Sequence, residues 1–145
     1  MANYYGVART NYFAVKSAED FTAEMANYNV EVITQQDKDG VTLYGLMDQN
    51  SDGGGWDWSY VAELEDEDGE IIETDLEIDW VEVFARHLVD GWVAILMETG
   101  AEKYRYLSGY ALAVNSKGES REINLSRDID KLAHELGETV TGVGW

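Results

Sequence analysis

The chain has 145 residues, of which 45% are hydrophobic and 12% aromatic, so it can form a hydrophobic core and we expect one domain over residues 1–145. Its net charge of −19 disfavours direct binding of nucleic acid or anionic membranes and favours a basic protein surface as partner. The absence of cysteine excludes disulfides, thiolate metal sites and cysteine nucleophiles, and suits a reducing cytosol. Met1–Tyr5 lacks a basic start, and no apolar run is long enough to span a bilayer, so we expect neither a signal peptide nor a membrane partner.

The first third of the chain predicts a strand, a helix and a hairpin. Asn11–Lys16 is rich in aromatic and β-branched residues, which favours a strand. Ser17 is a typical helix N-cap, and the helical spacing after it predicts a buried stripe of Phe21, Met25 and Tyr28. Two strand-like runs then flank a turn at Asp37–Gly40, which predicts a hairpin of residues 30–34 and 41–47.

The middle of the chain is strongly acidic. From Asp39 to Ala85 there is no lysine or arginine, and fifteen acidic residues give this part a charge of −15, against −4 for the remainder. After the loop at Gly53–Gly55, mostly apolar and acidic residues alternate with a period of two, which predicts a hairpin over about residues 56–78. One face of the first strand would carry Trp58, Tyr60, Ala62 and Leu64, and one face of the second Ile72, Thr74, Leu76 and Ile78. The opposite face would carry Glu63, Glu65, Glu73, Asp75 and Glu77, with a turn at Asp66–Gly69.

The remaining sequence predicts two helices and three strands. Asp79 and Glu82 fit a capping box before a helix that buries Trp80, Val83, Phe84 and Leu88. Three strands are predicted over residues 92–98, 103–114 and 119–125, and a turn at Asn115–Gly118 joins the last two. Ser126 or Asp128 would open a third helix, with Ile129, Leu132, Ala133 and Leu136 inside. This order predicts an α+β fold, a mostly antiparallel sheet with about three helices packed on it.

Asp48, Asn50 and Asp52, followed by Gly53, match the first half of a calcium-binding loop, D-x-N-x-D-G. The twelfth position of such a loop is Ser59, where a bidentate glutamate is expected, and the flanking residues favour strands over helices. This loop is therefore a weak candidate calcium site, the sequence also allows loose and weak cation binding by Asp66, Asp68 and Glu70, and it indicates no cofactor.

No motif for catalysis is present in the sequence. It contains no P-loop, G-x-S-x-G elbow or dinucleotide fingerprint. His87 and His134 are interpreted as side chains at the boundary of a buried helix face and not as general bases. We therefore predict a protein that is not an enzyme.

Three stretches resemble small acidic proteins carried by bacteriophages and other mobile elements. They are Asn3–Phe13, Val93–Lys103 and Tyr104–Gly118, together about half of the chain, and the likeness lies in the texture of the sequence. The resemblance implies an inhibitor of bacterial defence, either anti-restriction or anti-CRISPR, that occupies a DNA-binding channel in the cytoplasm of a bacterial host. No residue role is carried over by it.

The sequence-based hypothesis is a mimic of nucleic-acid charge that binds a basic nucleic-acid-binding protein, such as a CRISPR effector or a restriction enzyme. A calcium-binding module and an acidic protein-interaction module stay open as alternatives, and the oligomeric state is not predicted. The residues expected to contact the partner are Trp56, Glu63, Glu65, Asp66, Glu67, Asp68, Glu70, Glu73, Asp75, Glu77, Asp79 and Glu82.

Overall fold

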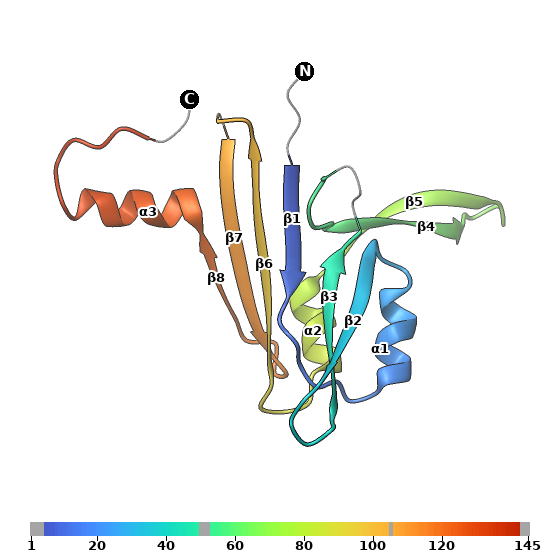
Figure 1. Cartoon of the computed structure of the whole chain (residues 1–145). Coiled ribbons are helices and arrows are strands. Elements are labelled where there is room, and N and C mark those ends of the chain that lie inside the picture. The colour runs from blue at the N-terminus through green and yellow to red at the C-terminus, as the bar shows by residue number, and fades with distance from the viewer. Residues whose placement is uncertain (1–4, 50–52, 105, 143–145) are drawn as a thin grey trace.

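The protein has an α+β fold built on an antiparallel sheet (Figure 1). The structure is a computed structural model that describes residues 5–49, 53–104 and 106–142. In these residues, six strands form the main sheet in the order β2-β3-β1-β6-β7-β8, and β4 and β5 form a separate two-stranded sheet. The elements are β1 (Tyr5–Thr10), α1 (Ala18–Met25), β2 (Val30–Gln36), β3 (Thr42–Asp48), β4 (Ser59–Glu65), β5 (Ile71–Glu77), α2 (Trp80–His87), β6 (Val93–Glu102), β7 (Tyr106–Asn115), β8 (Ser120–Asn124) and α3 (Leu125–His134).

The first strand lies earlier in the chain than the sequence predicted. β1 covers Tyr5–Thr10 and pairs with both β3 and β6, whereas the predicted strand over residues 11–16 is wrong. Within that segment Phe13 and Val15 form isolated bridges, to Tyr44 and Leu88. Both segments have strand propensity, and pairing with β3 and β6 makes the earlier one the strand. These partners are more than thirty residues away in the chain, so local sequence does not reveal them.

Three hairpin turns use the same side-chain chemistry. Asp37, Asp66 and Asn115 each present one side-chain oxygen that accepts hydrogen bonds from the backbone N–H groups two and four residues later, at 2.8–3.0 Å. The residue three positions later is glycine each time, with φ of 83°, 79° and 80° for Gly40, Gly69 and Gly118. Only glycine adopts this left-handed conformation without strain, so the turns were predictable from the residues alone.

One aromatic core lies between the main sheet and helices α1 and α2. Phe13 is fully buried and meets Phe21 and Phe84 edge-on, with ring centroids 5.9 Å apart in each case. Trp80 is the first residue of α2 and is 1% exposed, and its ring centroid lies 5.4 Å from that of Phe84. Both helices begin at their predicted caps, because Ser17 accepts a hydrogen bond from the Asp20 N–H and Asp79 accepts one from the Glu82 N–H. None of the helices in the described ranges has both the length and the apolar character needed to cross a membrane.

The third helix differs from its prediction in start and in burial. Asn124 caps α3, in place of Ser126 or Asp128. The predicted inward stripe is wrong, because Ile129, Leu132 and Leu136 are 52%, 54% and 92% exposed. Helical spacing identifies a stripe that favours burial but does not identify the surface that covers it. Figure 1 shows α3 extending away from the sheet beyond β8.

A partly buried carboxylate joins α1 to α2. Glu24 accepts hydrogen bonds from Arg86 at 2.6 Å and Tyr28 at 2.7 Å, and lies 2.7 Å from His87 Nε2. Burial raises the pKa of Glu24, but the hydrogen bonds from Arg86, Tyr28 and His87 outweigh it and lower the pKa from 4.5 to about 2. His87, predicted at the boundary of a buried helix face, is 7% exposed, and its contact with Glu24 gives it a structural role.

This cluster predicts a specific loss of stability at low pH. The pKa of Glu24 is lower in the folded chain, so its stabilising effect is complete above pH 4.5 and is lost as the pH falls towards 2. We expect Glu24→Gln to lower the free energy of unfolding at pH 6 by about 2 kcal/mol, with a smaller difference from the wild type at pH 2.5. Urea unfolding followed by tryptophan fluorescence measures both values. Glu31→Gln, at an exposed position of β2, is the control, and a Glu24→Gln difference that does not change with pH would contradict the assignment.

A candidate acidic interaction surface on the β4–β5 hairpin

The pairing of β4 with β5 places the predicted carboxylates on one face. Glu63 lies opposite Glu73, Val61 opposite Asp75, and Ser59 opposite Glu77. Residues on one face of a strand repeat every second position, about 6.6 Å apart. The acidic face of the hairpin is therefore defined by Glu63, Glu65, Glu73, Asp75 and Glu77, all of which are exposed.

Among the residues that the structure describes, no cation forms an ion pair with this acidic face. Like charges directly opposed across a pair of strands are unfavourable, as Glu63 and Glu73 are here. Among the described residues, the ion pairs formed by lysine, arginine and histidine go to carboxylates outside the hairpin: Glu24, Glu82, Glu122, Asp128 and Asp130. The negative charge of the face is thus available to an incoming partner.

The opposite face of the hairpin holds it to the protein at its base. Tyr60 meets Tyr28 edge-on, with ring centroids 5.2 Å apart. Further along, Leu64 and Ile72 are 42% and 46% exposed, so the core does not cover the outer part of the hairpin. Figure 1 shows the two strands projecting sideways from the body of the fold.

The predicted role of Trp56 at the rim is wrong. Trp56 is 5% exposed, and its ring centroid lies 4.8 Å from that of Trp80, inside the core. Its backbone N–H donates to Glu98, which fixes the chain just before β4. The large apolar area of the Trp56 indole is removed from water where it packs on Trp80, whereas the equally large indole of Trp58 stays partly exposed. Trp56 anchors the base of the hairpin and cannot contact a partner there.

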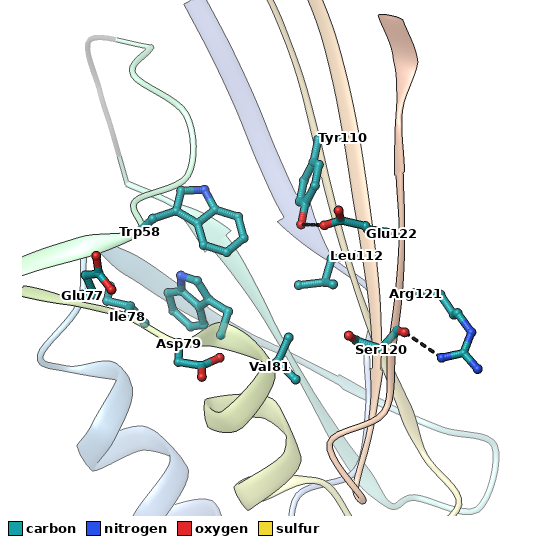
Figure 2. Close-up of a pocket in the computed structure, with 11 residues that line it drawn as sticks. Trp58, Glu77, Ile78, Asp79, Val81, Tyr110, Leu112, Ser120, Arg121 and Glu122 are labelled. Carbon is teal, nitrogen blue, oxygen red and sulfur yellow. Dashed lines mark hydrogen bonds between the residues drawn. The ribbon is translucent and has the colours of Figure 1, made fainter. Parts of the chain in front are cut away.

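Among the described residues, the exposed tryptophan is Trp58, two residues later, which the sequence assigned only to a strand face. Trp58 is 43% exposed and meets Tyr110 of β7 edge-on, with centroids 5.8 Å apart. It borders a cleft of about 780 Å³ between the start of α2 and strands β7 and β8. In Figure 2, Trp58 and Tyr110 lie next to each other at the border of this cleft, and Tyr110 donates to Glu122 at 2.9 Å. Burial and this carboxylate raise the pKa of Tyr110 to about 12, so its hydroxyl stays a donor.

The other predicted contact residues divide into two groups. Glu67, Asp68 and Glu70 are exposed at the tip of the hairpin and extend its negative charge. Three further residues have structural roles: Asp66 holds the turn, Asp79 caps α2, and Glu82 pairs with Arg86 at 3.4 Å. The candidate surface is therefore the hairpin with its tip, and its charge does not continue evenly into α2.

The calcium candidate gains no support from the described part of the loop. Asp48 Oδ2 accepts a hydrogen bond from the Ala8 N–H at 2.6 Å, which ties β3 to β1. Asn50 and Asp52 lie outside the described residues. Within the described ranges, no three His, Cys, Asp or Glu side chains are grouped so that they could hold a metal ion.

Comparisons with protein-family models, with curated protein sequences and with solved structures found no match to this chain.

The turn at the hairpin tip can be tested through its shared chemistry. Asp66→Ala removes the acceptor of two backbone hydrogen bonds, and we expect hydrogen exchange in β4 and β5 to accelerate about fivefold, as loss of about 1 kcal/mol implies. Asp66→Asn is the matched control, because Asn115 holds the same turn with an amide oxygen. It should keep the wild-type exchange rates, and equal acceleration in both variants would contradict this role.

Proposed function

We propose that this protein is a non-enzymatic inhibitor that binds the basic nucleic-acid-binding surface of a bacterial defence protein through its acidic hairpin. The observation that carries the proposal is an ordered face of five carboxylates, exposed and without a neutralising cation in the described structure. A protein channel that attracts phosphates by means of lysine and arginine attracts such a face for the same reason. Occupation of that channel would exclude the nucleic acid.

The charge density of the hairpin supports this mimicry. Strands of seven residues are about 23 Å long, and nine acidic residues lie between Ser59 and Glu77. This amounts to about one charge per 2.6 Å, against one per 1.7 Å of axis for duplex DNA. The two densities are of the same order, and both form rows along a backbone.

Apolar side chains among the carboxylates favour a protein as the partner. Val61 and Ile71 belong to the acidic face and are 60% and 67% exposed. A small cation would gain nothing from them, whereas a protein surface would bury them. Electrostatic attraction would speed the encounter, and burial of these residues would slow dissociation.

The class of target comes from the resemblance to small acidic proteins of phages and mobile elements. Proteins of that kind that oppose host defence have as targets a restriction enzyme or a CRISPR effector complex, both of which hold nucleic acid in basic channels. An acidic interaction module with a different basic partner is the alternative. It differs in a measurable way, because its binding would not compete with nucleic acid.

Charge reversal on β5 tests the proposal. The variant Glu73→Lys, Asp75→Lys, Glu77→Lys replaces three exposed carboxylates of the acidic face. The target is first identified as the restriction enzyme or CRISPR effector, from a purified panel, whose DNA cleavage the wild type inhibits. We expect the variant to inhibit that enzyme about 100-fold less strongly. Three lost charge contacts at about 1 kcal/mol each give a change of that size. Inhibition by the wild type should weaken as salt increases and should be competitive with DNA.

The control is a variant with the same change in charge at other positions. Glu19→Lys, Glu31→Lys and Asp39→Lys are at exposed sites outside the hairpin, so this triple variant should inhibit almost as well as the wild type. Circular dichroism establishes that both variants are folded. Undiminished inhibition by the β5 variant, or an equal loss in both variants, would show that the hairpin is not the contact surface.

A further inference from the structure

A second surface of the molecule, remote from the hairpin, is rich in exposed apolar side chains. The open face is the face of β1, β6, β7 and β8 that does not cover the aromatic core. Its outward positions include Val7 at 71%, Met97 at 56% and Ile123 at 64% exposure. An antiparallel sheet with one face in water normally carries polar residues there. The sequence of β6, VAILM, is instead apolar on both faces, which is typical of a strand buried on both sides.

Helix α3 faces the edge of this surface with its own exposed stripe. Leu125, Ile129 and Leu132 are spaced on one side of the helix and are 52–56% exposed. The absence of a side chain at Gly109 lets α3 approach β7, since a Cβ built there would lie 3.1 Å from Leu125 Cβ. Between helix and sheet lies an apolar groove of about 400 Å³, and its lining includes Met97, Ala111, Ile123, Leu125, Ile129 and Leu132.

We propose that a second copy of this chain covers the groove, with the α3 stripe of each protomer seated in the groove of the other. A groove between a sheet and one helix accepts another amphipathic helix, and α3 supplies one of the right character. Because each protomer offers both the stripe and the groove, a two-fold axis satisfies both at once, as in isologous dimers. This inference is independent of the proposed function.

The distribution of charge favours a second copy as the occupant. Residues 1–102 carry the whole net charge of −19, whereas residues 103–145 carry six lysines and arginines against six acidic residues. The neutral part includes β7, β8 and α3, so two copies can meet there without strong repulsion. Figure 1 shows α3 and the acidic hairpin beyond opposite edges of the main sheet, so this contact keeps the two hairpins far apart.

The total surface area also indicates an unfilled interface. A compact monomer of 16.3 kDa is expected to expose about 7,500 Å². This chain exposes 9934 Å². The excess of about 2,400 Å² exceeds the share of about 800 Å² that each partner buries in a stable dimer.

Molar mass in solution tests the proposal. At 50 µM chain and 0.15 M salt, we expect light scattering after size exclusion to give about twice the 16.3 kDa chain mass. The variant Ile129→Glu, Leu132→Glu should be monomeric, because it places charge in the stripe. Lys131→Glu changes the net charge by the same two units on the polar side of α3 and should remain dimeric. A monomeric wild type, or a dimer that the stripe variant does not weaken, would overturn the proposal.

Cross-linking provides a measurement that does not depend on how the stripe variant folds. The chain has no cysteine, so Leu132→Cys and Met97→Cys chains can be mixed and oxidised without side reactions of native thiols. We expect a covalent heterodimer, because α3 of one copy would lie on β6 of the other. Lys131→Cys mixed with Met97→Cys is the control and should give at least tenfold less product. Equal yields from the two mixtures would overturn the swapped arrangement.

Discussion

The aromatic contacts at the base of the β4–β5 hairpin are what the proposed functional arrangement depends on. A two-stranded hairpin alone is marginally stable in water, and this one also opposes Glu63 to Glu73. Tyr60 against Tyr28, and Trp56 against Trp80, bury enough apolar area next to the hairpin to offset that cost. A fixed backbone keeps the carboxylates in rows, so the charge is presented with a defined spacing. A disordered acidic segment would have the same net charge but would lose conformational entropy on binding.

The main sheet separates two kinds of surface. On one side of the molecule the hairpin is charged and projects into solvent, and on the other the open face and α3 are apolar and nearly neutral. Long-range attraction acts on the first and short-range burial on the second, so the two can bind different partners without competing. The same separation reduces repulsion between copies, since charges farther apart than about 8 Å are screened at physiological salt.

Local chemistry made much of the fold predictable, and the failures share one physical cause. The three turns, the caps of α1 and α2 and the two faces of the hairpin depend on neighbours in sequence, and they were predicted correctly. The position of β1, the burial of Trp56 and the exposure of α3 depend on which distant surface is within reach. Glu24 gave no signal, because its partners Arg86 and His87 lie more than sixty residues away. The candidate surface was predictable as a charged face, whereas its anchoring at Trp56 was not.

The proposed dimer limits how the acidic hairpins could act. With α3 and the open face in the interface, the two hairpins would lie far apart, because each projects beyond the edge of its own main sheet that is opposite to α3. They could not enter one channel together, so each would engage a separate target or a separate site on a large one. Two sites on a single complex would raise the apparent affinity through effective concentration, without any new contact at either hairpin. Two separate targets would instead be brought together, and inhibition would follow simple one-to-one binding at each hairpin.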